Sequence, residues 1–417
     1  MEFRTIKGFK DILPHEVGNW QFLESEARKV FHAFGYREIR TPILEWTELF
    51  SRSIGQETDI VSKEMYTLTD SRGRGMTLRP EATASVVRAY IQEGLYRKNP
   101  LQKLYCIGPM FRHERPQKGR FRQFHQLDAE FFGDPGPESD AETIIMAMRL
   151  FERLGLEGLV LNLNSLGCPG CRPGFREKLT AYLAERSDAL CGDCRRRSET
   201  NPLRVFDCKV PGCGEVMAEA PAITGSLCGE CRDHFAAVSA CLERAGVPFV
   251  LNPRLVRGLD YYNRTTFEVQ TDRLGAQNAV AGGGRYDGLV KLLGGPDHPA
   301  IGFAVGVERV IALLEEKGAR ATPRPDLFVA AIGPAARDAA FGWVMDLRAL
   351  GLWVEMGYGT GGLKSRMKRA DRLGARKVLI VGDDELASGK AVLRDMGTGD
   401  QETVPLSDIV NHFKGAF

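Results

Sequence analysis

The C-terminal part of the chain has the most regular alternation of apolar and polar segments. Residues 326–332 form a nearly continuous apolar run suited to a buried strand, and apolar positions at helical spacing follow from Asp338 to Leu350. Two more strand candidates, Leu352–Met356 and Lys377–Val381, flank a basic helical segment at Leu363–Leu373. Strands that alternate with helices predict parallel βαβ units, and therefore a small α/β domain.

The first 320 residues have a different pattern. Lys103–Gly108 and Phe121–Phe132 are strand candidates on either side of a polar, basic loop, which predicts an antiparallel hairpin. Phe267–Gln270 and Ala300–Val305 are further strands, and the latter runs through Gly306 into a predicted helix at Val307–Glu316. These elements indicate an α+β architecture, an antiparallel sheet with helices on one side.

Composition sets the class of protein and its division into domains. The 417 residues, 43% hydrophobic and 26% charged, are typical of a globular protein with two or three domains. Lys317–Pro325 is small, basic and Pro-containing, which indicates a linker between domains at 1–320 and 325–417. We find neither a signal peptide nor the roughly 20 apolar residues of a membrane span, and expect a cytoplasmic protein without membrane contact.

Net charge does not identify a partner. The 56 Lys and Arg residues against 54 Asp and Glu residues give a formal charge of +2. Such a balance neither indicates nor excludes a nucleic-acid ligand, and any basic surface must be local.

Cysteines concentrate in one segment, which we interpret as an insertion at about 168–240. In a large cytosolic chain, closely spaced cysteine pairs indicate metal binding rather than disulfides. The spacing suggests one or two structural zinc sites of four thiolates, and the pairs can also interleave. Taken in chain order, the two candidate sets are Cys168, Cys171, Cys191 and Cys194, and then Cys208, Cys213, Cys228 and Cys231. Buried free thiols are the alternative.

The segment Phe111–Gln126 carries the densest chemistry. Clustered guanidinium groups suit a polyphosphate, because their planar N–H pairs match phosphate oxygens. Phe121 and Phe124 supply an apolar face for a base, whereas a solvated, charged turn is the simpler explanation. The strand context and the interleaved aromatic residues favour phosphate binding. The cations are Arg112, Arg115, Lys118, Arg120 and Arg122.

Four further segments each have an ordinary structural explanation when taken alone. In Thr77–Thr83, Pro80 ends a strand, and the carboxylate and hydroxyl that follow suit the start of a helix. Arg257–Tyr262 reads as a polar turn, and the three glycines of Ala281–Gly288 as a tight turn or a close approach to a ligand. Gly302–Arg309 places an arginine near a helix start.

In combination, these segments resemble the motifs of class II aminoacyl-tRNA synthetases, and specifically those of the histidyl-tRNA synthetase family. Arg112–Glu130 resembles class motif 2, and Gly302–Arg309 resembles motif 3. Arg257–Tyr262 and Gly282–Asp287 resemble the two signatures peculiar to the histidine enzymes. Lys7–Pro14 resembles the family's N-terminal opening, so the likeness spans nearly the whole chain.

The resemblance implies activation of histidine by ATP, a step that depends on in-line positioning and charge neutralisation. Arg112 would hold the α-phosphate, Arg309 the γ-phosphate, and Arg257 would be a fixed cation at the reacting centre. The adenine would meet Glu114, Phe124 and Arg120, and Mg²⁺ would bridge the outer phosphates.

The resemblance also implies a histidine pocket. Glu81, Thr83 and Gln126 would bind the ammonium group. Glu130 and Tyr262 would hydrogen-bond the two imidazole nitrogens, an effective means of discrimination. Tyr261 and Tyr286 would lie close by. Ala82 departs from the family's usual glycine.

The implied partners are tRNA(His) and a second copy of the chain in a homodimer. The C-terminal domain would bind the anticodon, with basic residues between Lys364 and Lys377 near its phosphates, and the loop Arg115–Gly119 would touch the acceptor stem. A catalytically silent relative, the regulatory subunit of ATP phosphoribosyltransferase, is the alternative. It characteristically lacks the C-terminal domain and loses signature residues, whereas Arg257 and Arg309 are present here.

Overall fold

The computed structural model describes residues 3–56, 58–117, 119–275, 278–318, 324–359 and 361–414. The chain divides into two compact units, residues 1–320 and 321–417. The predicted linker falls largely outside the described residues, since 319–323 are not among them. Within the described residues, none of the helices combines the length and apolar character needed to cross a membrane.

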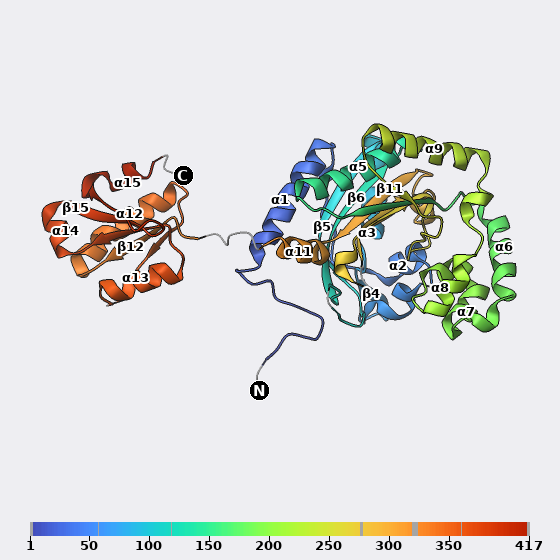
Figure 1. Cartoon of the computed structure of the whole chain (residues 1–417), viewed down its shortest axis with the longest axis horizontal. Coiled ribbons are helices and arrows are strands. Elements are labelled where there is room, and N and C mark those ends of the chain that lie inside the picture. The colour runs from blue at the N-terminus through green and yellow to red at the C-terminus, as the bar shows by residue number, and fades with distance from the viewer. Residues whose placement is uncertain are drawn as a thin grey trace. The chain divides into compact units, whose positions relative to one another are not determined.

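An eight-stranded sheet organises the first unit (Figure 1). Its order is β1-β5-β6-β11-β10-β9-β7-β8, with parallel pairs only at the two edges. The strands are β1 (Arg37–Glu38), β5 (Gln102–Phe111), β6 (Gln123–Phe132), β7 (Val160–Ser165), β8 (Val250–Leu251), β9 (Asn263–Gln270), β10 (Ala279–Arg285) and β11 (Ala300–Gly306). The predicted antiparallel hairpin is confirmed as β5 and β6, and the central strands follow the predicted antiparallel arrangement.

Long helices cover one face of this sheet, in agreement with the predicted α+β class. They are α1 (Val17–Ala33), α5 (Pro137–Arg153), α9 (Gly229–Arg244) and α11 (Val307–Glu316), whose buried apolar residues share one core with the strands. The shorter α3 (Thr83–Gln92) packs on the opposite face, together with Leu104, Phe132 and Tyr286. The predicted helix at 307–316 is confirmed as α11.

Smaller elements complete the first unit. Antiparallel strands β2 (Leu44–Trp46), β4 (Gly75–Leu78) and β3 (Tyr66–Thr69) form a separate sheet. The short helices are α2 (Thr47–Ile54), α4 (Leu95–Lys98) and α10 (Leu289–Leu292), with a π-helical turn at Ile60–Glu64 and a 3-10 turn at Asp272–Leu274.

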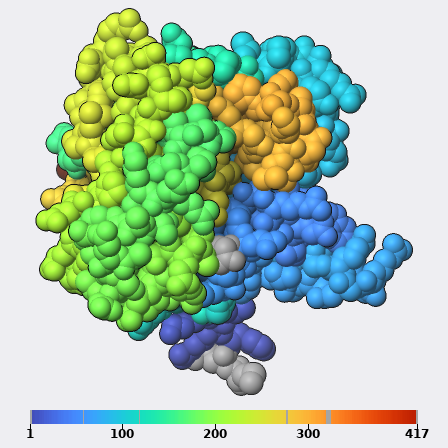
Figure 2. Space-filling model, turned by 90° about the vertical axis from the view of Figure 1, so that its right-hand side faces the viewer, coloured from blue at the N-terminus to red at the C-terminus, as the bar shows by residue number. Residues whose placement is uncertain are grey.

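The cysteine-rich segment between β7 and α9 forms a helical insertion with its own small core. Its helices are α6 (Arg172–Ala184), α7 (Gly192–Thr200) and α8 (Pro211–Ala218), with 3-10 turns at Ser187–Ala189, Pro202–Asp207 and Ile223–Ser226. Phe175, Leu179 and Leu183 of α6 pack there against Val205 and Met217. Figure 2 shows the insertion in green beside the blue N-terminal segment, which it contacts through an ion pair between Arg197 and Asp59.

A buried ion pair fixes the end of β10 to the start of α5. Arg285 and Asp140 are fully buried, and their Nη2 and Oδ1 atoms lie 2.5 Å apart. His234 of α9 approaches the other carboxylate oxygen at 2.8 Å. Carbonyls of Asp134 and Gly136 accept further bonds from the guanidinium group. A buried charge with this many partners is compensated rather than isolated.

The second unit is an α/β domain with a mixed sheet of order β13-β12-β14-β15-β16. The strands are β12 (Leu327–Ala331), β13 (Val354–Met356), β14 (Lys377–Val381), β15 (Lys390–Asp395) and β16 (Gln401–Pro405). The helices are α12 (Pro334–Ala349), α13 (Leu363–Arg372), α14 (Asp383–Ser388) and α15 (Ile409–His412), with a 3-10 turn at Leu406–Asp408. The predicted parallel βαβ units are confirmed for β12, β13 and β14, and β15 and β16 add an antiparallel edge.

Candidate active site

A cavity of about 240 Å³ lies on the face of the eight-stranded sheet opposite α1 and α11. It collects predicted site residues from β6, the β5–β6 loop, the segment before β9 and the start of α11. The predicted residues that line it are Glu81, Thr83, Arg112, Glu114, Arg120, Phe124, Gln126, Arg257, Tyr261, Tyr262 and Arg309. The remaining two predicted residues, Glu130 and Tyr286, are buried next to this lining.

Strand alternation of β6 explains the floor of the cavity. Phe124, Gln126 and Asp128 point to the cavity, whereas Leu127 and Ala129 belong to the core beneath the helices. The β11 residues paired with Gln126, Asp128 and Glu130 are Gly306, Ala304 and Gly302. These small residues leave space above the sheet, and a Cβ atom on Gly302 would collide with the Glu130 carboxylate.

Three arginines make one side of the cavity cationic. Arg112 donates from Nε to the Pro80 carbonyl at 2.9 Å, and its guanidinium group lies 5.2 Å from the centre of the Phe124 ring. Arg309 donates to the Ala279 carbonyl. Burial lowers the pKa of Arg112, Arg120 and Arg309, and for Arg309 the two neighbouring guanidinium groups lower the pKa further. Convergent cations that repel one another are a site for a polyanion.

Glu114 places a carboxylate within this cationic group. Its side chain is nearly buried and pairs with Arg120. Arg120 also lies 3.9 Å from Glu64, and Arg112 lies 3.9 Å from Glu114. The carboxylate therefore orients the loop arginine while facing the same cavity as Phe124.

Arg257 also lines the cavity, and an ion pair fixes its orientation. Its Nη1 atom donates to Glu268 Oε2 on β9 at 2.6 Å, and its guanidinium group lies 5.7 Å from the centre of the Tyr262 ring. Burial opposes the charge, but Glu268 and neighbouring tyrosines outweigh it and raise the pKa of Arg257. Arg257 is therefore a permanent, oriented cation. Glu268 was not predicted; its signal was a lone acidic residue within a strand candidate.

A network of buried carboxyl groups adjoins Tyr261 and Tyr262. Glu130 accepts 2.6 Å bonds from the Thr83 and Tyr286 hydroxyls, one on each carboxylate oxygen. Glu81 accepts from the backbone N–H groups of Thr83 and Ala84, at 2.7 and 2.9 Å, and so caps α3. The capping interpretation of Glu81 is confirmed, and the same carboxylate also lines the cavity. Burial raises the pKa of Glu81 and raises that of Glu130 well above its usual range.

Two buried oxygens in the cavity have no protein partner among the described residues. They are Oε1 of Gln126 and Oδ2 of Asp128. Burial, followed by repulsion from Glu81, raises the pKa of Asp128 well above its usual range. Buried acceptors without a donor indicate a place for a ligand that carries donors, such as an ammonium group. Asp128 was not among the predicted site residues, although it shares the period of Gln126 and Glu130.

The eight cysteines of the insertion form two sets, and the grouping in chain order is wrong. One set is Cys168, Cys171, Cys228 and Cys231, and the other is Cys191, Cys194, Cys208 and Cys213. Within each set the sulfur atoms all lie within 4.8 Å of one another. The second set is nested inside the first along the chain. Such nesting is a tertiary arrangement in which the ends of the insertion come together, and residue spacing alone does not reveal it.

The predicted basic residues of the second unit are only partly exposed. Arg366 is buried, and its guanidinium group donates to the carbonyls of Gly357, Gly359 and Gly361. It holds the loop before α13 and is not available for a phosphate, so its inclusion among the phosphate contacts was wrong. Lys364, Lys368, Arg369 and Arg372 are exposed. In the first unit Arg115 is exposed, and Lys118 lies outside the described residues.

Comparisons with known proteins agree with this geometry. A family model described as histidyl-tRNA synthetase matches residues 8–310, and one described as an anticodon binding domain matches residues 326–415. A histidine–tRNA ligase of Desulfatibacillum aliphaticivorans is 57% identical over 408 residues, 98% of this chain and 97% of its own. One from Desulfosudis oleivorans is 58% identical over 407 residues, 97% of this chain and 96% of its own.

A solved structure extends the likeness to three dimensions. The apo histidyl-tRNA synthetase of S. aureus has a TM-score of 0.84 at 37% identity, covering 99% of this chain and 100% of that one. The family model matches most of the first unit, and the relatives are similar to this chain over nearly their full length. The chain therefore belongs to the histidyl-tRNA synthetase family, the ligases that attach histidine to tRNA(His).

Proposed function

We propose that the cavity beside β6 binds histidine and ATP together and joins them as histidyl-adenylate. A carboxylate oxygen of histidine would attack the α-phosphorus, and the bond from that phosphorus to pyrophosphate would break. The observation that carries this proposal is the confluence of three arginines, Arg112, Arg257 and Arg309, with buried acceptors in one cavity. Fixed cations stabilise charge that develops on the phosphoryl oxygens without reorganising at the moment of reaction.

Each side of the cavity would bind one part of the substrates. Arg112 would bind the α-phosphate and Arg309 the γ-phosphate, while Phe124 and Glu114 would hold the adenine with help from Arg120. Arg257, locked by Glu268, would stay at the reacting carboxylate. These assignments suit the geometry because Arg112 already lies against Phe124 and Arg309 stands at the start of α11.

The histidine end would use the carboxyl groups. Gln126, Glu81, Thr83 and, in addition to the sequence prediction, Asp128 would take the ammonium group, since two of their buried oxygens lack a donor. Tyr261 and Tyr262 line the cavity where the imidazole would lie. Glu130, held by Thr83 and Tyr286, would accept from one ring nitrogen.

In the second step, the terminal adenosine hydroxyl of tRNA(His) would attack the adenylate carbonyl, and AMP would leave. The second unit would bind the anticodon, with the exposed cations of α13 near phosphates. We also propose a homodimer in the cytoplasm, as the family assignment suggests. Light scattering on the purified chain would test the dimer.

Two metals belong to this proposal. Mg²⁺ would accompany the ATP phosphates, because it prefers carboxylate and phosphate oxygens and Glu268 and Glu308 line the same cavity. Zinc would be structural and would occupy the two cysteine sets, whose four close sulfurs are the donors of a closed tetrahedral site.

Histidine-dependent exchange of labelled pyrophosphate into ATP tests the proposal directly. We expect exchange with histidine and with no other amino acid, followed by charging of tRNA(His). The Arg257→Met variant should lose exchange while keeping its fold. Absence of exchange from folded, metal-replete protein would contradict the proposed chemistry.

A further inference from the structure

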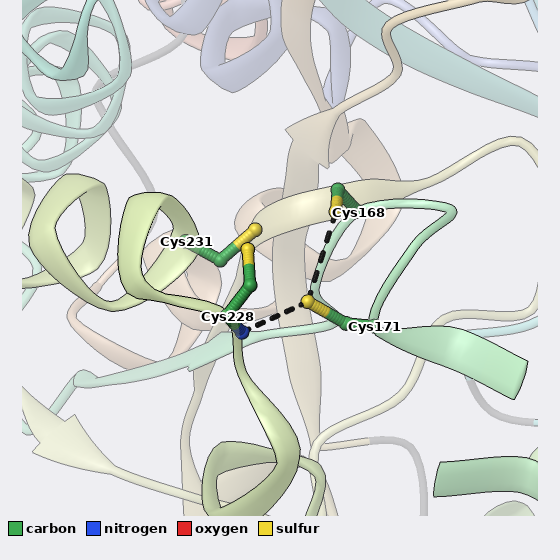
Figure 3. Close-up of side chains that lie close together, drawn as sticks. All are labelled: Cys168, Cys171, Cys228 and Cys231. Carbon is green, nitrogen blue, oxygen red and sulfur yellow. Dashed lines mark hydrogen bonds between the residues drawn. The ribbon is translucent and has the colours of Figure 1, made fainter. Parts of the chain in front are cut away.

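The first cysteine set closes the neck of the insertion. Cys168 and Cys171 follow β7, where the chain enters the insertion, and Cys228 and Cys231 stand at the start of α9, where it leaves (Figure 3). The sulfurs of Cys168 and Cys171 lie 3.7 Å apart. Tetrahedral zinc with bonds of about 2.3 Å separates its sulfurs by about 3.8 Å. The Cys228 N–H group donates to the Cys171 sulfur at 3.1 Å, a bond typical of a metal-bound thiolate's surroundings.

The residue after this neck bonds to the backbone of a residue that lines the active cavity. Arg172 is the first residue of α6 and directly follows Cys171. Its Nη2 atom donates to the backbone carbonyl of Tyr262, whose ring lines the active cavity. The position of Cys171 therefore sets where the Arg172 side chain begins, and Arg172 fixes the Tyr262 backbone from outside the cavity.

The second cysteine set supports a parallel contact. Arg204 belongs to the 3-10 turn Pro202–Asp207, which ends at the proposed ligand Cys208. Its Nη1 atom donates to the Arg257 carbonyl at 3.1 Å, and Asp207 holds the same guanidinium group at 2.9 Å. The Arg204 side chain is only 12% exposed. Arg257 and Tyr262 are thus both held, through their backbones, by arginines close in sequence to cysteine ligands: Arg172 directly follows Cys171, and Arg204 lies in the turn that ends at Cys208.

We propose that the two metal sites position the 257–262 segment of the active site through Arg172 and Arg204. Metal fixes the neck and the core of the insertion, and these two positioning residues carry that rigidity to the backbone of Arg257 and Tyr262. The inference rests on the proposed function of the cavity. It makes the insertion a support for the histidine pocket as well as an appendage of the catalytic unit.

A set of arginine variants tests this role. Arg172→Met removes the donor and keeps an unbranched apolar stem. Arg176→Met is the matched control, because Arg176 and Arg172 line one further cavity at the edge of the insertion, but Arg176 donates to the Thr200 carbonyl within the insertion. We expect Arg172→Met to raise the KM for histidine about tenfold in pyrophosphate exchange and to leave the KM for ATP nearly unchanged. Arg172→Lys, which keeps a donor, should recover part of the loss.

The metal is tested separately with Cys228→Ser. Elemental analysis of the zinc-replete wild type should give about two zinc ions per chain, and the variant about one. The variant should share the raised KM for histidine. Adding Arg172→Met to Cys228→Ser should raise this KM by a smaller factor than Arg172→Met does in the wild type, since both changes disturb the same contact to Tyr262.

Two outcomes would overturn the inference. One is an Arg172→Met enzyme with the same histidine KM as Arg176→Met; the other is a Cys228→Ser enzyme that loses zinc but keeps the wild-type KM. Wild-type protein that shows no histidine-dependent exchange would contradict the proposed function instead, so the two failures are distinguishable.

Discussion

Gly282 lies directly against the guanidinium group of Arg257: a Cβ atom on Gly282 would come within 2.4 Å of Arg257 Nη1. The obstacle is a side chain and not backbone, so a larger residue at 282 would push the Arg257 guanidinium group away from Glu268 and leave the fold of the backbone in place. Glycine is therefore needed at 282 because it leaves room for the Arg257 guanidinium group, and not because the backbone turns there.

We expect Gly282→Ala to lower the rate of histidine-dependent exchange on the order of 100-fold, because a displacement of about 1 Å at a reacting group has this effect. The melting temperature should change little. Gly174→Ala is the control, since a Cβ atom on Gly174 meets no atom within 4 Å. Wild-type exchange in Gly282→Ala would show that Arg257 need not occupy its observed position.

Asp128→Asn should make the protein more stable and weaken its binding of histidine. Burial, and then Glu81, raise the pKa of Asp128 well above its usual range, so the wild type loses stability as pH rises from the pKa of an unfolded aspartate, about 4, up to that raised pKa. The variant should be more stable than the wild type by about 1 kcal/mol or more near pH 8, with no difference below about pH 4, where both side chains are neutral. Urea unfolding at both pH values measures this.

The same variant should bind histidine less well, because its side chain is neutral where the ammonium group would lie. A KM for histidine equal to that of the wild type would remove Asp128 from the proposed site. The stability difference would remain, since it depends on the burial of Asp128 and on its repulsion by Glu81 and not on histidine binding.

Arg285→Met should unfold far more easily than the wild type. Removing one member of a buried ion pair leaves the other charge uncompensated and costs about 3–5 kcal/mol. Arg273→Met is the matched control, because the pair between Arg273 and Glu316 is about one third exposed and should contribute less than about 1 kcal/mol. Equal denaturant midpoints for the two variants would contradict the proposed importance of the buried pair.

Removal of metal should loosen the insertion selectively. Its own core is small, and small cores depend on added cross-links or metal. Hydrogen exchange after treatment with a chelator should accelerate in α6, α7 and α8, while β9, β10 and β11 remain protected. If exchange in α6, α7 and α8 is the same before and after treatment with the chelator, the insertion does not depend on metal.

Local pattern was sufficient for much of the fold. The β5–β6 hairpin, the strand that runs through Gly306 into α11, and the βαβ units of the second unit each depend on neighbouring residues, so their periodicity predicts them. The resemblance to a family then supplied residues that line one cavity, although they come from segments as distant as Glu81 and Arg309.

Contacts between distant segments were beyond the sequence pattern. Arg285 and its buried partner Asp140 are 145 positions apart. Nothing in the local sequence shows that Arg285 forms this ion pair while the next residue, Tyr286, donates to Glu130. Arg366 shares a basic helix with exposed cations and is nevertheless buried. The cysteine grouping likewise depends on the ends of the insertion meeting, a property of the assembled unit.

The two-faced alternation of β6 restricts how the length of this region can change in evolution. Phe124, Gln126 and Asp128 face the cavity, and Leu127 and Ala129 face the core. One residue gained or lost within 123–132 would exchange the two faces, sending core leucine into the cavity and carboxyl groups into the apolar layer. Insertions and deletions among related sequences should therefore occur in the loop before β6 and not within the strand.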